Sequence, residues 1–179
     1  EETGFRKLFE KAIGNFFASE LSRSEGWRVY PGKQYVWPVS AASAGIRSYL
    51  PIMITDTILE NEIEGRRIII DTKFTSILTP AQHGGFRFKT GHLYQLYAYL
   101  RSQEQPADPL SLGADGLLLY PAIGLEVDES ALIQGHRIRF ATINLSQSTS
   151  EVVERLRMLP KRSSIGDEGV KNAGDPCFS

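Results

Sequence analysis

The sequence predicts a single α/β domain in which a mixed central sheet is flanked by helices. The chain has 179 residues, of which 41% are hydrophobic, enough to bury one core. Segments rich in β-branched residues alternate with segments whose apolar residues recur every three or four positions, which is typical of strands interleaved with amphipathic helices. We expect the domain over residues 1–160 and a disordered tail, rich in Ser, Gly and Asp, over 161–179.

Charge and cysteine content exclude several classes of protein. The formal net charge of -1 argues against a protein that holds nucleic acid by bulk positive charge, so any contact with DNA is expected to be local or delivered by a partner. The single cysteine, Cys177, excludes an internal disulfide and a cysteine-based zinc site. The sequence shows no signal peptide and no membrane-spanning apolar run, so a cytoplasmic location is expected.

The first predicted element is an amphipathic helix over residues 3–21. Its apolar side chains recur at spacings of three and four and would pack on the sheet: Phe5, Leu8, Phe9, Ala12, Ile13, Phe16, Phe17 and Leu21. Glu10 lies at the margin of that face. Residues 26–39 then indicate a first strand or hairpin around a Pro31-Gly32 turn, and the small residues 41–45 indicate a linker.

A β-hairpin is predicted at the centre of the chain, with arms at residues 50–59 and 66–74 and a charged, glycine-containing turn at 62–65. Side chains alternate between the two faces of a strand. Asp56 should therefore share a face with Ile54 and Ile58, and Asp71 should share one with Ile69 and Lys73. Charges on a largely apolar surface are unfavourable unless they pair or bind a cation.

This hairpin carries the residue types that metal-dependent phosphodiester hydrolysis requires. Two carboxylates from adjacent strands, Asp56 and Asp71, can hold a hard divalent cation, which polarises a phosphoryl oxygen and activates a bound water. Lys73 can orient that water or stabilise charge on the phosphate. The alternative interpretation of Asp-x-Lys is a salt bridge at the edge of a strand.

The region after the hairpin is expected to be loop-like over residues 76–85. Its glycines allow either a mobile element that orders on DNA or a connection without a role, the second being favoured for His83. A helix is predicted over 89–101. Gln95 and Tyr99 lie four apart on one face of it, with His92 on the same side, where they can bind phosphate oxygens or orient Lys73.

The last third of the chain predicts two more strands and a helix. Residues 115–121 form a short apolar run, which indicates a buried strand parallel to the earlier ones. Residues 136–145 alternate basic and apolar side chains, which indicates a strand with one open face, where Arg137 and Arg139 contact DNA or solubilise a sheet edge. Ser148 or Ser150 can cap a helix that runs to Met158.

The order helix, strand, strand, strand, helix, strand is that of the restriction-endonuclease-like core, α-β-β-β-α-β. The motif Thr55-Asp56, then Asp71-Thr72-Lys73, resembles the PD-(D/E)xK nuclease superfamily, although the proline of the nominal motif is missing. The helix with Gln95-x-x-x-Tyr99 resembles its RecB-like branch. Together with the segments 8–11 and 50–56, these motifs resemble the nuclease domain of McrC-type proteins, the cleavage subunits of restriction systems directed at 5-methylcytosine DNA, over roughly residues 5–159.

The resemblance implies an endonuclease that cleaves DNA with Mg²⁺, for which Mn²⁺ can substitute. It implies Asp56, Asp71 and the backbone carbonyl of Thr72 as metal ligands, with Lys73 as the catalytic lysine. It makes Glu10 a candidate third carboxylate, the alternative being a solvated helix-flank glutamate, and it gives Gln95 and Tyr99 supporting roles.

The family acts with a nucleotide-hydrolysing AAA+ partner, a GTPase of the McrB kind. Such proteins carry a further N-terminal region that engages this partner, and the present sequence begins at the nuclease helix, so partner binding is not assured. Two other interpretations remain open. One is a RecB-like exonuclease or repair nuclease, and the other is an inactive nuclease fold that serves in binding or assembly.

Overall fold

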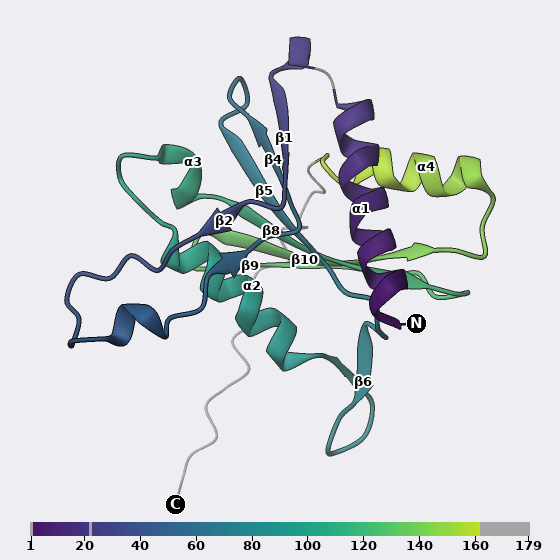
Figure 1. Ribbon diagram of the computed structural model, residues 1–179. Helices are drawn as coiled ribbons and strands as arrows, with labels where there is room; N and C mark the ends of the chain where they lie inside the picture. Colours follow the sequence, from purple (N-terminus) through teal and green to yellow (C-terminus); the bar gives the residue numbers. More distant parts are fainter. Residues whose placement is uncertain (1, 22, 162–179) are drawn as a thin grey trace, which may run out of the picture.

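A six-stranded mixed sheet forms the centre of the protein (Figure 1). The computed structural model describes residues 2–21 and 23–161. The strands of the sheet, in spatial order, are β1 (Trp27–Pro31), β4 (Thr57–Asn61), β5 (Arg66–Thr72), β8 (Asp115–Ala122), β10 (His136–Asn144) and β9 (Asp128–Ile133). The pairs β1–β4, β4–β5 and β9–β10 are antiparallel, whereas β5–β8 and β8–β10 are parallel. The predicted α/β class with a mixed sheet is confirmed.

Helices cover both faces of this sheet. The α-helices are α1 (Glu2–Glu20), α2 (Thr90–Ser102), α3 (Pro109–Leu112) and α4 (Thr149–Met158), and two short 3-10 helices are η1 (Arg23–Glu25) and η2 (Ile46–Ser48). Helices α1 and α4 pack into one core cluster with Leu59, Ile70 and Leu119 of the sheet. Helix α2 packs into a second cluster with Ile69 and Leu118, which are the alternate residues of the same strands.

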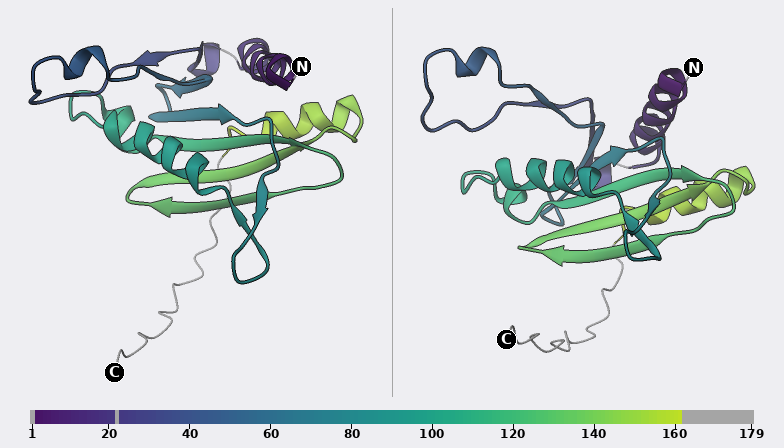
Figure 2. Two further views of the ribbon diagram at one scale, coloured as in Figure 1. Left: turned by 60° about the horizontal axis from the view of Figure 1, so that its bottom comes forward. Right: turned by 90° about the horizontal axis from the view of Figure 1, so that it is seen from below.

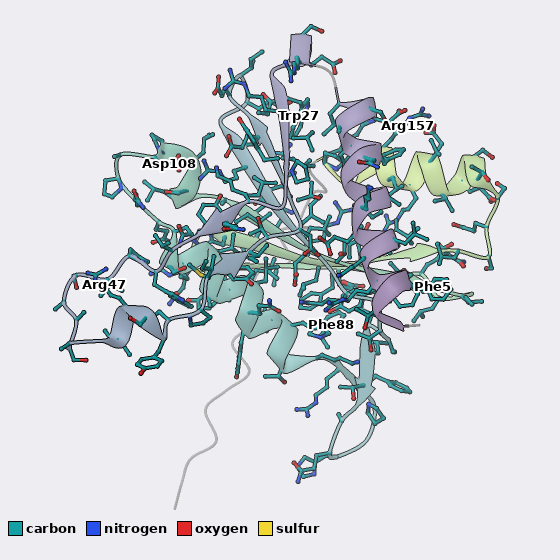
Figure 3. All side chains as sticks on the ribbon, viewed as in Figure 1. Phe5, Trp27, Arg47, Phe88, Asp108 and Arg157 are labelled. Carbon is teal, nitrogen blue, oxygen red and sulfur yellow. The ribbon has the colours of Figure 1, made fainter. Side chains whose placement is uncertain are left out.

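Helix α1 begins and ends within one residue of the predicted range, but its buried stripe is narrower than predicted. Ile13 and Phe17 are buried, whereas Phe5 and Leu8 near the amino end are largely exposed. Helices α1 and α4 lie side by side, and Arg157 of α4 donates a hydrogen bond to Glu20 of α1 (Figure 3). The helix therefore anchors to the sheet through its second half.

The central hairpin is confirmed for β4 and β5, in which Thr57 pairs with Ile70 and Asn61 with Arg66. The first arm is shorter than predicted because the chain bends at Asp56, before β4. The preceding β3 (Met53–Ile54) pairs instead with β2 (Gln34–Tyr35) in a separate small sheet. The segment between β2 and β3, which carries Arg47, projects away from the main sheet (Figures 2 and 3).

Two other predictions need correction. The predicted loop contains a second small hairpin, β6 (Leu78–Pro80) paired with β7 (Phe86–Phe88), with His83 in its turn. Strand β10 has no open edge, because β8 pairs along one side and β9 along the other. The alternating basic and apolar residues of β10 suggested a strand at the edge of the sheet. The true edge strand is β9, whose mostly exposed residues were not predicted to form a strand.

Arg139 is consequently buried rather than solvating an edge strand. Its Nε and Nη2 donate to the two oxygens of Asp128, each at 2.6 Å, and its Nη1 donates to the carbonyl oxygen of Leu159 at 2.9 Å. Arg155 of α4 adds a further hydrogen bond of 2.7 Å to Asp128. These bonds tie β9, β10 and α4 together.

The last helix is capped as predicted. Ser148 accepts a hydrogen bond from the backbone of Glu151, whose carboxylate in turn accepts one from the Ser148 backbone. The predicted disordered tail begins at 161, and all but its first residue lies outside the described residues. Among the helices that the structure describes, none is both long and apolar enough to cross a membrane.

Candidate active site

Asp56 sits in the bend between β3 and β4, beside the end of β5. Its carbonyl oxygen accepts a hydrogen bond from Gly32 at 2.9 Å, which fixes the bend against the turn after β1. Its carboxylate Oδ2 accepts two bonds of 2.6 Å, from the backbone N and the hydroxyl Oγ1 of Thr72. The Asp56 side chain is thus held directly against the last residue of the neighbouring strand.

Asp71 lies one residue earlier in β5 and is almost completely buried. Its Oδ2 forms an ion pair with Nζ of Lys73 at 2.8 Å, and this buried oxygen has no further hydrogen-bond partner among the described residues. Burial raises the pKa of Asp71 to about 6; Lys73 opposes this rise, while the charges of Asp56 and Glu10 add to it. The site therefore holds a carboxylate whose negative charge is not fully compensated.

The parallel pairing of β5 with β8 positions this Asp-x-Lys segment. Asp71 is opposite Leu118, and the backbone N of Lys73 donates to the carbonyl oxygen of Leu119 at 2.9 Å. Because Asp71 and Lys73 are two residues apart in extended chain, both side chains point toward the face that α2 covers. The predicted shared face of Asp71 and Lys73 agrees with their ion pair.

Glu10 of α1 is the third carboxylate near this position. It lines a groove of about 420 Å³ together with Asp56. Burial and the charge of Asp56 raise the pKa of Glu10, while Arg6 and Lys7 partly offset the rise. Glu10, Asp56 and Asp71 thus lie within electrostatic reach of one another.

Helix α2 supplies a polar chain that ends on Lys73. Gln95 Oε1 accepts a hydrogen bond from Lys73 Nζ at 2.7 Å, and Gln95 Nε2 donates to the hydroxyl of Tyr99 at 2.9 Å. The helical spacing of four brings the two side chains of α2 together, as predicted. The lysine ammonium is therefore held between Asp71 and Gln95.

His92 does not join that chain and has a partner that sequence reasoning missed. Its Nδ1 is 2.9 Å from the hydroxyl of Tyr120, a fully buried residue of β8. Burial, Lys73 and Lys89 lower the pKa of His92, and burial together with the charge of Asp71 raises the pKa of Tyr120. The only available signal was the strand register, which places Tyr120 next to Lys73 once β5 and β8 are paired.

The residues present fit a hard divalent cation in part. The buried Asp71 Oδ2 lacks a further hydrogen-bond partner in the part of the chain that the structure describes, and Asp56 and Asp71 supply the oxygen donors that Mg²⁺ prefers. Within residues 2–21 and 23–161, however, no three Asp, Glu, His or Cys side chains are already gathered as a metal site. Glu10 is therefore not preassembled with the two aspartates, and the predicted ligand set of Asp56, Asp71 and the Thr72 carbonyl stays a prediction.

Comparison with known proteins gives one informative match. No family model matches the sequence. A protein of Escherichia coli strain K12, the type IV methyl-directed restriction enzyme EcoKMcrBC, is 32% identical over 141 residues. This match confirms the resemblance to McrC-type proteins. The matched region is 78% of the present chain but only 38% of the McrC-type relative, so the chain spans well under half of that protein's length.

Proposed function

We propose that this domain is a Mg²⁺-dependent DNA endonuclease, the cleavage domain of a restriction system directed at methylated DNA. The observation that carries the proposal is the convergence of Asp56, Asp71 and Lys73 at the ends of two paired strands, with Lys73 held by Gln95. The order α1, β1, β4, β5, α2, β8 supports the finer assignment to the restriction-endonuclease-like core. Similarity to a methyl-directed restriction enzyme supports the class of substrate.

In this proposal the chain's own residues position the scissile phosphate. When bound, Mg²⁺ would polarise a phosphoryl oxygen and lower the pKa of a water molecule, with Asp56, Asp71 and the Thr72 carbonyl as its ligands. The ammonium of Lys73 has three N–H donors, of which two are directed toward Asp71 and Gln95. The third can donate to a phosphate oxygen or to the attacking water.

Asp56 is oriented for its role by Thr72. The two hydrogen bonds from Thr72 fix one carboxylate oxygen of Asp56. Because Thr72 belongs to β5, this strand sets the orientation of the carboxylate. A ligand whose direction is set in this way binds a metal without first losing rotamer freedom. Gln95 plays the equivalent part for Lys73, and Tyr99 for Gln95.

We further propose that the domain acts with a nucleotide-hydrolysing AAA+ partner of the McrB kind. The name of the similar E. coli enzyme, EcoKMcrBC, supports this pairing. A near-neutral net charge of -1 also fits a nuclease that is delivered to DNA rather than one that binds it strongly alone.

The proposal is tested with supercoiled and linear plasmid DNA, in Mg²⁺ and in EDTA, with and without a GTPase partner. Endonuclease activity nicks or linearises the circular form, whereas a RecB-like exonuclease degrades only the linear form. Lys73→Ala should abolish cleavage. Cleavage retained in EDTA, or by Lys73→Ala, would contradict the proposal.

A crystal soaked in Mn²⁺ tests the metal site directly, because manganese occupies oxygen sites of this kind and gives an anomalous signal. We expect a peak between Asp56 and Asp71. An ordered, accessible site without a peak at high Mn²⁺, together with no cleavage of either DNA form, would favour an inactive binding module.

A further inference from the structure

A groove beside the proposed site is lined by polar and cationic residues that the mechanism above does not use. Lys7, Lys11 and Asn15 of α1 lie on its wall, with Asp56 in the same groove. The three α1 residues are spaced by four and therefore form one row along the helix. Glu10 of the same helix lies beside this row and lines the same groove.

From this arrangement we propose that the row of Lys7, Lys11 and Asn15 binds the phosphates that neighbour the scissile one, so that one DNA strand runs along α1. The inference rests on the proposed nuclease function. At a rise of about 1.5 Å per residue, the row from Lys7 to Asn15 is about 12 Å long. That length matches the axial rise of three to four nucleotides in one strand, at about 3.4 Å each.

The opposite wall of the groove leaves room for a backbone to approach. Gly32 lies there with a positive φ of 65°, and a Cβ added to it would meet nothing within 4 Å. Thr57 also lines the groove, and its buried Oγ1 has no hydrogen-bond partner among the described residues.

The groove carries two cations, Lys7 and Lys11, and two carboxylates, Glu10 and Asp56, so a phosphodiester would be attracted along the row and not beside the carboxylates. The cations stand in a local row although the whole chain has a net charge of -1. The carboxylates repel phosphate until a metal binds, so the row supplies attraction at the positions where the metal does not act.

The test measures binding of a labelled DNA duplex by fluorescence anisotropy, in Ca²⁺ and over a range of salt, with DNA integrity checked on a gel. Lys7→Gln/Lys11→Gln should weaken binding roughly tenfold and reduce the slope of log affinity against log salt by about 1.8. Asn15→Lys should strengthen binding and increase the slope by about 1. Both results would support the strand path.

Matched controls separate the groove from general charge effects. Arg28→Gln/Arg47→Gln removes the same two charges from β1 and η2, and Ala12→Lys adds a charge to α1 at a residue that does not line the groove. Both should leave the salt slope unchanged. Equal effects of the groove and control variants would overturn the inference.

The outcome also distinguishes the inference from the function on which it rests. Plasmid cleavage by the wild-type chain together with unchanged binding by Lys7→Gln/Lys11→Gln would overturn the strand path and leave the nuclease function standing. A wild-type chain that neither binds nor cleaves DNA would overturn both.

Discussion

Two carboxylates that face cationic side chains, the buried Asp71 and the partly exposed Asp128, have opposite surroundings. Asp71 faces one ammonium and has an oxygen without a further hydrogen-bond partner among the described residues, and burial raises its pKa to about 6. Asp128 accepts bonds from both Arg139 and Arg155. Burial alone would raise the pKa of Asp128, but the two guanidinium groups outweigh this effect and lower it.

We interpret this difference as that between a carboxylate that serves the fold, Asp128, and one that serves the proposed active site, Asp71. Asp128 joins β9, β10 and α4, and its charge is compensated by its neighbours. Asp71 is paired with the ammonium of Lys73 alone, and this single cation does not outweigh the burial that raises its pKa. Incomplete compensation of a buried carboxylate is what a cation-binding role would leave in the unliganded chain.

Replacement of Asp71 should produce the largest effect and should act on activity alone. We expect Asp71→Asn to reduce DNA cleavage by at least about 10³-fold, the scale of losing one preorganised group in a transition state. In metal-free buffer the variant should be about as stable as the wild type, because the cost of burying the carboxylate charge is removed while Lys73 keeps its hydrogen bond to Gln95. Cleavage assays and urea unfolding measure the two quantities, and a marked loss of stability would assign Asp71 to the fold instead.

Asp128→Asn should show the reverse pattern. We expect a loss of roughly 1–3 kcal/mol in the free energy of unfolding, because the buried guanidinium of Arg139 loses its charged partner. Cleavage measured at a temperature where the variant is folded should not change. Denaturant titration gives the stability, and the finding that would count against this assignment is normal stability with impaired cleavage.

A smaller effect is expected at Gln95, which acts through Lys73. The variant Gln95→Ala loses the hydrogen bond to the Lys73 ammonium. It should cleave DNA about tenfold more slowly than the wild type, which is equivalent to about 1.4 kcal/mol. Tyr99→Phe removes only the bond that orients Gln95 and should reduce cleavage less. Steady-state kinetics on a defined duplex ranks the two variants. A larger loss in Tyr99→Phe than in Gln95→Ala would contradict the proposal that Tyr99 acts on Lys73 through Gln95.

The smallest effect concerns acid stability. Because the folded-state pKa of Asp128 is below its ordinary value, its contribution is present above the unfolded pKa and is lost as the pH falls through the folded one. Its side chain is about one third exposed, so solvent screening keeps the contribution to about 1 kcal/mol or less. The difference in unfolding free energy between the wild type and Asp128→Asn should therefore shrink below about pH 4. A constant difference from pH 7 to pH 3 would contradict this prediction.

Much of the fold could be predicted because it depends on near neighbours in the sequence. The ranges of α1 and α2, the β4–β5 hairpin and the Ser148 cap all follow from spacings of a few residues. The surroundings of Arg139 could not be predicted, because an alternating basic strand gives the same pattern at an edge and beside a weakly apolar neighbour such as β9.

The candidate site shows the same division. Asp71, Lys73, Gln95 and Tyr99 interact as their spacing predicted. The bend at Asp56 and its bonds to Thr72 depend on the turn after β1, more than twenty residues earlier, and Tyr120 reaches His92 only through the pairing of β5 with β8. These contacts between distant segments carry no local signal.

The pairing of β5 with β8 has a consequence for how the protein is made. The β4–β5 hairpin closes a short loop and can form early, whereas the bond from Lys73 to Leu119 must wait until more than forty further residues are available. During synthesis the Asp-x-Lys segment therefore exists for some time without the strand that positions it. If the proposed nuclease function holds, a growing chain carries the complete motif before the active site is assembled.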